Sequence, residues 1–315
     1  MSEDEAYDAF VAIRYAETNG EPFCPKCDCA TVYRLTRTYK PRGKDAGLAP
    51  PQTRRLFKCK FCLHQFSVTS GTIFASRKMP YRDILAAIAE FTNGAKGVSA
   101  LHLGRMLGRQ HKTVFVLAHK LREALNSLQG ARLSGEVEID ATYTGGYVKP
   151  ARRKAHQRDR RRLENQTGKK QCLITMRERG GRVWAFVERS EAAAIPTIID
   201  RLEDDTTVFT DEAKAYDTLY GRFDMKRIDH SKEWANEEVS TNQAESFHSR
   251  VKRAVRGTYH HIAGPHIQNY LGELAWRENT RRLSNGEQFL TVAAAGLHHA
   301  TSRQWKGYWQ RRKAA

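Results

Sequence analysis

The chain has 315 residues, with 53 lysines and arginines against 35 aspartates and glutamates, so its formal net charge is +18. This length allows one sizeable core with one or two small modules. The positive charge favours a polyanionic partner, nucleic acid first. No apolar run approaches the roughly 20 residues that cross a bilayer, and the acidic start MSEDEA is unlike a signal peptide. We therefore expect a protein of the prokaryotic cytoplasm rather than of the membrane.

The first part of the chain is predicted to hold a structural zinc site. Residues 1–20 are expected to form an N-terminal helix, and residues 21–75 a zinc ribbon, because two C-x-x-C pairs flank a strand-rich segment. Thiolates two residues apart on a tight turn suit the tetrahedral coordination of Zn²⁺, and cysteines in a reducing compartment argue against disulfides. Cys29 is interpreted as a bystander that could replace Cys27, and Cys172 as a core residue. The predicted ligands are Cys24, Cys27, Cys59 and Cys62.

Residues 76–130 are predicted to be helical, because apolar residues recur there at steps of three and four. A short helix, a turn containing Gly108 and a longer basic helix have the outline of a helix-turn-helix that reads DNA. Arg109 and Lys112 would then open the recognition helix. The alternative is a helical spacer that packs on the next domain, and the net charge favours DNA contact slightly.

Residues 131–283 have the pattern of an α/β domain. The order is three strands, a helix, a strand, a helix, a strand and a final helix, which is typical of an RNase H-like fold with a mixed five-stranded sheet. The predicted strands are 136–140, 172–177, 182–188, 206–210 and 225–228, with helices at 191–202, 213–219 and from 241 onward.

Two aspartates stand at the ends of predicted strands in this domain. Asp140 ends the first strand and Asp211 the fourth. Together with a carboxylate on the last helix they could hold two divalent cations about 4 Å apart, an arrangement that serves displacement at phosphorus. Each acid has another interpretation: Asp211 could cap the next helix, and Glu138 faces the same way as Asp140. Further acids read as turn or helix-end residues; they are Asp200, Asp204 and Asp205.

The helix that begins near residue 241 supplies the third acid. Glu245 and Lys252 lie two turns apart, on a line that Asn242 shares. This line is opposite a predicted buried stripe, so the carboxylate and the cation would be exposed on one face. The predicted buried stripe is Ala244, Phe247, Val251 and Ala254.

Basic residues gather in several segments that are predicted to contact DNA phosphates. The insertion 149–170 lies between the first two strands and has almost no apolar content, so we expect it to neutralise phosphates rather than read bases. The basic helical tail 284–315 could pack on the protein or touch DNA. The predicted DNA contacts are Arg109, Lys112, Arg152, Arg153, Lys154, Lys252, Arg253 and Arg256.

Four motifs give the chain a resemblance to a known family. They are IDATYTGG at 139–146, FTDEAKAY at 209–216, HSKEW at 230–234 and TNQAESFHSRVKR at 241–253. With the leading zinc ribbon, this combination resembles bacterial insertion-sequence transposases that carry a DDE-type, RNase H-like catalytic domain. The resemblance covers nearly the whole chain, from about residue 7 to residue 282.

The resemblance implies a set of roles for individual residues. Asp140 and Asp211 match the two aspartates of the family, Glu245 the glutamate and Lys252 the basic residue two turns later, with Mg²⁺ or Mn²⁺ as the catalytic metal. Asn242 is the alternative to Glu245, and we choose the carboxylate because it binds divalent cations better than an amide. The chain departs from the family pattern at two positions that remove no metal ligand: Ala141 stands where an acid is common, and His248 where a larger aromatic residue is.

The function that the resemblance implies is transposition. The protein would bind the terminal inverted repeats of its element, cleave the DNA and transfer the strand, acting on duplex DNA as a dimer or larger oligomer. One alternative is a non-catalytic or domesticated DNA-binding regulator, which the complete set of three acids argues against. Another is an RNase H-like nuclease or resolvase, which the zinc ribbon argues against.

Overall fold

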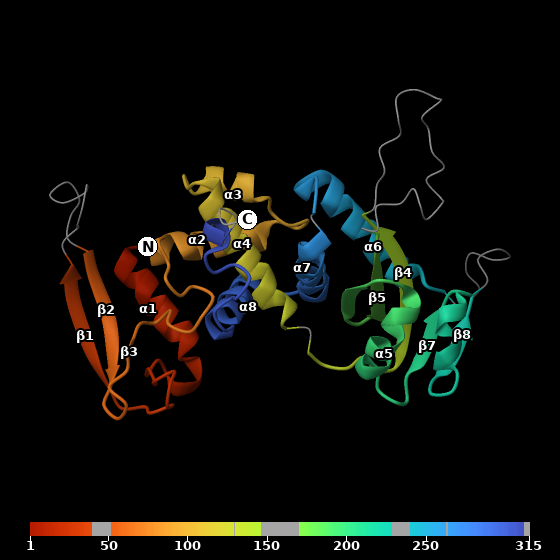
Figure 1. Cartoon of the computed structure of the whole chain (residues 1–315), viewed down its shortest axis with the longest axis horizontal. Coiled ribbons are helices and arrows are strands. Elements are labelled where there is room, and N and C mark those ends of the chain that lie inside the picture. The colour runs from red at the N-terminus through yellow and green to blue at the C-terminus, as the bar shows by residue number, and fades with distance from the viewer. Residues whose placement is uncertain (40–51, 129, 146–169, 229–239, 263, 312–315) are drawn as a thin grey trace, which may run out of the picture. The chain divides into compact units, whose positions relative to one another are not determined.

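The computed structural model describes residues 1–39, 52–128, 130–145, 170–228, 240–262 and 264–311 (Figure 1). The chain divides into two compact units. The first unit contains residues 1–93, 100–124 and 284–315, so both ends of the chain belong to it. The second unit contains residues 94–99 and 125–283.

The first unit combines a small sheet with helices. The strands β1 (Val32–Tyr39), β2 (Gln52–Cys59) and β3 (Gln65–Phe66) form an antiparallel sheet in that order. The helix α1 (Glu3–Arg14) begins with a capping box in which the Ser2 side chain and Glu5 satisfy each other's backbone N–H groups. The remaining helices of the unit are α2 (Tyr81–Asn93), α3 (Ala100–Met106), α4 (His111–Asn126), α8 (Asn285–His298) and α9 (Tyr308–Arg311).

The helices between residues 81 and 126 differ in two details from those predicted from the sequence. In α3 only Leu103 and Gly104 are buried, while Leu101 and Met106 are about half exposed. α4 begins at His111, so Arg109 lies in the turn before it rather than on the helix. Apolar spacing over a single two-turn helix does not decide which residues it buries, because the stripe is too short to orient it.

The second unit is built on a five-stranded mixed sheet. Its strands are β4 (Glu136–Thr144), β5 (Gln171–Glu178), β6 (Val183–Glu188), β7 (Thr207–Thr210) and β8 (Asp224–Arg227), in the order β6-β5-β4-β7-β8. β5 is antiparallel to both of its neighbours, whereas β7 and β8 run parallel to β4. Three consecutive antiparallel strands followed by two parallel ones give the order 3-2-1-4-5, which is the RNase H-like fold that the sequence predicted.

Helices cover both faces of this sheet. α5 (Glu191–Arg201) packs on one face against Cys172, Ile174 and Met176 of β5. α6 (Asn242–Ala254) and α7 (Ile267–Thr280) pack on the other, against Leu173 of the same strand. β5 is therefore buried on both sides, which explains its continuous apolar run.

Candidate active site

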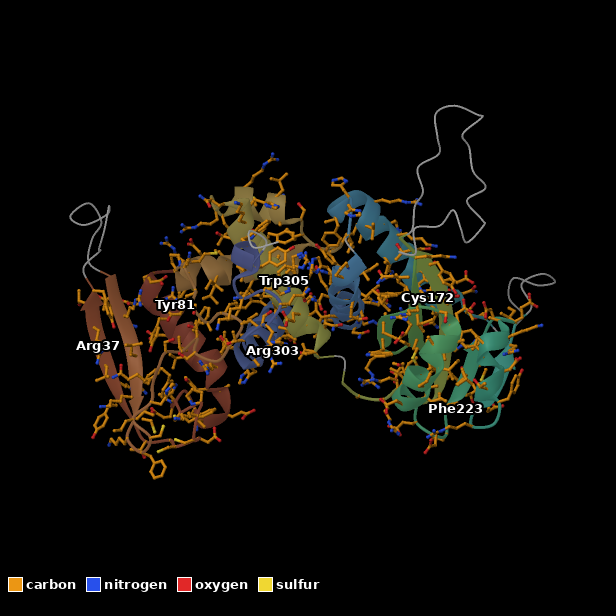
Figure 2. All side chains as sticks on the ribbon, in the orientation of Figure 1. Arg37, Tyr81, Cys172, Phe223, Arg303 and Trp305 are labelled. Atoms are coloured by element: carbon orange, nitrogen blue, oxygen red, sulfur yellow. The ribbon has the colours of Figure 1, made fainter. Side chains whose placement is uncertain are left out.

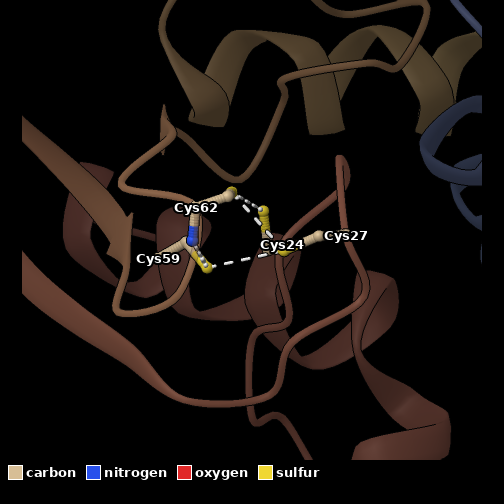
Figure 3. A group of neighbouring side chains, drawn as sticks. All are labelled: Cys24, Cys27, Cys59 and Cys62. Atoms are coloured by element: carbon tan, nitrogen blue, oxygen red, sulfur yellow. Dashed lines mark hydrogen bonds between the residues drawn. The ribbon is translucent and has the colours of Figure 1, made fainter.

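The four predicted zinc ligands form one cluster (Figure 3). All four sulfur atoms lie within 4.8 Å of one another, with Cys24 Sγ 3.5 Å from Cys62 Sγ and Cys27 Sγ 3.6 Å from Cys59 Sγ. Tetrahedral coordination at about 2.3 Å requires sulfur atoms roughly 3.8 Å apart, so the cluster fits Zn²⁺. Cys29 lies outside the cluster, with its thiol 3.8 Å from a backbone oxygen, as expected for a bystander.

Asp140 lies on β4 and faces the helix α6. Its Oδ2 atom is 2.9 Å from Nδ1 of His248, whose Nε2 atom is 2.8 Å from the hydroxyl of Thr175. The side chain of Asp140 is 18% exposed and that of His248 only 5%. The residue that departs from the family pattern at position 248 is thus in direct contact with the first predicted catalytic acid.

Asp211 follows β7 directly, and Asp140 lies on the neighbouring strand β4. In the parallel pair of β4 and β7, Glu138 stands opposite Phe209, so two further residues along each strand lead to Asp140 and Asp211. The Oδ1 atom of Asp211 accepts a hydrogen bond of 3.1 Å from the backbone N–H of Ala213. This bond is the capping role considered for Asp211 from the sequence. It involves Oδ1 and not Oδ2.

The third acid is carried by α6, which packs against β4 and β5. Its predicted buried stripe is buried, and Glu245, Asn242 and Lys252 are all exposed. Glu245 Oε1 accepts a hydrogen bond of 3.3 Å from the Thr241 hydroxyl. Within the described parts of the chain, only the four cysteines bring three or more possible metal-ligand atoms within 4.8 Å of one another. The three acids therefore come from neighbouring elements without being drawn that tightly together.

Comparisons with known proteins agree with this architecture. Residues 132–279 match the model of the ISXO2-like transposase domain, and residues 1–65 match that of the transposase zinc-ribbon domain. A protein in transposable element ISH50 of Halobacterium salinarum is 24% identical over 307 residues, 94% of this chain and 98% of that protein. A transposase-like protein of Haemophilus influenzae is 30% identical over 106 residues, 33% of this chain and 85% of that protein.

The chain belongs to the zinc-ribbon insertion-sequence transposases with a DDE-type catalytic domain. The family assignment made from the sequence motifs is thereby confirmed. Among solved structures, the Mos1 strand transfer complex is similar at 13% identity with a TM-score of 0.20, covering 67% of this chain and 78% of the other; a score this low adds nothing to the assignment. Among the described residues, no helix is both long and apolar enough to cross a membrane.

Glu138 of this transposase has a different role from the catalytic one considered for it. Its side chain is 1% exposed, and its Oε2 atom accepts hydrogen bonds from the backbone N–H groups of Gln243 and Ala244 at 2.8 and 3.1 Å. Its Oε1 atom pairs with Arg179 at 3.2 Å. The carboxylate thus caps the N-terminus of α6, where backbone N–H groups lack partners and the helix dipole favours negative charge. Sequence reasoning missed this role because the helix lies about 100 residues away in the chain.

Further polar residues surround the strand ends that carry the two aspartates. Tyr143 of β4 donates a hydrogen bond of 3.1 Å to Glu191 at the start of α5. Burial raises the pKa of Tyr216, and the negative charges of Glu191, Asp211 and Asp140 add to that rise in pKa. Burial also raises the pKa of the Cys172 thiol to about 11. Glu191 is therefore a further carboxylate in contact with β4, and nothing in its sequence context distinguished it from an ordinary helix-start residue.

The predicted DNA contacts occupy different environments in the transposase. Arg109 forms an ion pair with Asp83 of α2. Lys112 is exposed at the start of α4, where Trp309 of the C-terminal tail donates a hydrogen bond of 3.2 Å to its carbonyl. The tail thus packs on α4. Three exposed basic residues lie on or just after α6; they are Lys252, Arg253 and Arg256. Arg152, Arg153 and Lys154 lie outside the described residues.

Proposed function

We propose that this transposase binds the terminal inverted repeats of its insertion sequence, cleaves a DNA strand at each end and joins the freed 3′ end to target DNA. The observation that carries the proposal is the register of β4 and β7. Glu138 is paired with Phe209, and Asp140 and Asp211 each come two residues later on these neighbouring strands, which supports their meeting at one edge of the sheet. Glu245 lies on α6, which packs against β4. Carboxylates from two adjacent strands and a late helix are the arrangement that phosphoryl-transfer enzymes use to hold divalent metals.

The donor set fits Mg²⁺ or Mn²⁺. Asp140, Asp211 and Glu245 offer carboxylate oxygens, the ligands that these hard cations prefer, and all three side chains are at least partly accessible. When bound, the metals would activate the attacking oxygen and stabilise the leaving oxygen of the displacement. Asn242, one turn before Glu245, would be an auxiliary ligand or a DNA contact.

The side chains around the acids would orient them. The contact between His248 and Asp140 fixes one carboxylate oxygen of the aspartate, and Thr175 holds the far nitrogen of the imidazole. Such contacts behind a metal ligand set its orientation and commonly change metal affinity or activity about 10–100-fold when they are removed. Glu138 holds the start of α6 beside β4, so the position of Glu245 would depend on it.

Exposed cations on α6 would receive the DNA. Lys252 lies two turns after Glu245, and Arg253 follows it, so both could contact phosphates beside the scissile bond. Transposition joins two ends to one target, and we therefore propose that the working form is a dimer or larger oligomer assembled on the DNA.

Strand cleavage on a labelled duplex carrying the end of the element tests the proposal. We expect cleavage by the native protein with Mg²⁺, none with EDTA, and a loss of at least about a thousandfold in D140N and D211N, since each substitution removes a charged ligand. D200N is the matched control, because Asp200 is an exposed acid at the end of α5. We expect D200N to cleave at the native rate.

The same assay separates the enzyme from its main alternative. Tight binding of the duplex by all four proteins without metal-dependent cleavage would contradict the catalytic proposal. That result would instead support a DNA-binding protein that has kept the transposase fold.

A further inference from the structure

The two faces of the hairpin formed by β1 and β2 differ in how their basic residues are neutralised. Alternate residues of a strand point to opposite faces, and the register pairs Thr36 with Arg55 and Arg37 with Arg54. One face therefore carries Arg34 and Arg55. The other face, which we call the outer ribbon face, carries Tyr33, Leu35, Arg37, Tyr39, Arg54, Leu56 and Lys58.

The arginines of the inner face are paired with acids. Arg34 lies 3.0 Å from Glu21, and Arg55 lies 2.6 Å from Asp4 of α1 and 3.7 Å from Asp8. Arg55 also stacks over the ring of Tyr7 at 4.7 Å. The contacts of Arg55 attach the inner face to α1, so the positive charge of this face serves the fold.

The outer ribbon face has no such neutralisation among the described residues. Arg37 and Arg54 are both exposed and stand directly opposite each other across the two strands. Neither β1 nor β2 contains an acid. Facing like charges destabilise a strand pair, so this arrangement costs stability unless an anion occupies the surface. Figure 2 shows Arg37 on β1, at the edge of the unit that α1 does not cover.

Aromatic side chains alternate with the cations on the same face. The Arg54 guanidinium lies 4.9 Å from the centre of the Tyr39 ring, and the Lys60 ammonium, next to the zinc cluster, lies 4.9 Å from that of Tyr33. Tyr33 is 52% exposed and Tyr39 39% exposed. Tyrosine hydroxyls and basic side chains are the groups that contact DNA phosphates and sugars, and a two-stranded ribbon fits the major groove of B-form DNA.

We propose that the outer ribbon face is a DNA-binding surface that contacts phosphates of double-stranded DNA. This inference rests on DNA as the substrate in the proposed function, but it concerns a surface remote in sequence from the catalytic acids. The zinc cluster closes one end of the hairpin, because Cys59 ends β2 and Cys62 follows it. Zinc would therefore hold the two strands in the register that brings the cations together.

The test compares two double variants of the full-length protein that each remove two positive charges from the same two strands. R37Q/R54Q changes the outer ribbon face, and R34Q/R55Q changes the inner one. The binding of a fluorescent 30-base-pair duplex is measured by anisotropy between about 50 and 300 mM salt, without divalent metal. Each lost phosphate contact lowers the slope of log K against log salt by about 0.9. We therefore expect R37Q/R54Q to reduce the slope by roughly 2 and the affinity at least about tenfold at 100 mM salt.

The inner-face variant should bind DNA within about twofold of the native protein, because its arginines already have carboxylate partners. Zinc content and thermal melting are measured on both variants. The single variant K58Q, on the outer face but without an opposing arginine, provides a second reading if R37Q/R54Q binds no zinc. Equal loss of affinity in the two double variants, or no loss in R37Q/R54Q and K58Q, would overturn the proposal. If R37Q/R54Q bound polyglutamate more weakly than the native protein but bound DNA equally well, the face would be assigned to an acidic protein partner. That result would also overturn the proposal.

The outcome of this DNA-binding test does not depend on whether the protein cleaves DNA. A protein that binds DNA through this face but cleaves nothing would leave the inference intact and refute the proposed enzymatic function. Metal-dependent cleavage by the native protein, with unchanged DNA binding in R37Q/R54Q and K58Q, would refute the inference and leave the proposed enzymatic function intact.

Discussion

At the scale of single residues, two of the three carboxylates on β4, Glu138 and Asp140, lie in different environments. Glu138 and Asp140 are two positions apart and so point to the same side of the sheet. Their contacts differ: Glu138 is buried and caps α6, while Asp140 is partly exposed and contacts His248. The resemblance to the family selected Asp140, but the spacing alone could not distinguish the two, because the distinguishing contacts come from α6.

Replacing Glu138 with glutamine should destabilise the second unit. E138Q removes the negative charge of a buried carboxylate from its ion pair with the partly exposed Arg179 and from the positive end of α6. Breaking a buried pair costs about 3–5 kcal/mol, and because glutamine retains one acceptor we expect about 2–3 kcal/mol. Urea unfolding followed by fluorescence measures the loss.

The matched control is E136Q, because Glu136 is about half exposed and pairs with the same arginine at 3.1 Å. An exposed pair contributes at most about 1 kcal/mol, so E136Q should unfold close to the native midpoint. Equal effects of the two variants would mean that the cap on α6 contributes nothing.

Glu245 and Asn242 can be ranked as third catalytic residue by their effects on cleavage. Both are exposed on α6, one turn apart. A carboxylate binds Mg²⁺ more strongly than an amide does, so we expect E245Q to lose about a thousandfold in cleavage rate and N242A about tenfold or less. The rates are measured on the same end-bearing duplex at saturating Mg²⁺. The reverse order would make Asn242 the ligand.

At the scale of the elements, the sequence predicted what local spacing determines. The C-x-x-C pairs, the buried stripe of α6 and the strand order of the RNase H-like sheet follow from short-range patterns, and the structure has all three. The pattern failed where contacts between elements decide the outcome. In α3, for example, Leu101 and Met106 fit the apolar spacing but are about half exposed.

Zinc should be required for the order of the ribbon. C62S removes one of four clustered thiolates, whereas C29S removes a cysteine outside the cluster. We expect C62S to lose bound zinc from about one ion per chain to near zero and to melt at a lower temperature, because metal binding contributes directly to folding in such modules. C29S should keep its zinc. Metal analysis and calorimetry check both, and zinc retained by C62S would contradict a site that needs all four cysteines.

At the scale of the whole molecule, the net charge of +18 describes the chain only as an average. Some basic residues are used within the fold: Arg55 is paired with α1, Arg109 with Asp83, and Arg177 with Glu278. Others remain exposed, on α6 and on the outer ribbon face. Composition predicts a polyanionic partner, but only the structure distinguishes charges that are available to it from charges that are not.

The most direct test of the account is strand transfer from a precleaved element end into a supercoiled plasmid. Precleaved DNA bypasses the first step, so the assay reports the joining chemistry alone. With Mg²⁺ we predict plasmid products for the native protein and for D200N, and none for D211N, although all three should bind the end equally well. Joining by D211N at the native rate would contradict the assignment of the acids, and no joining by any of the three would contradict the enzyme.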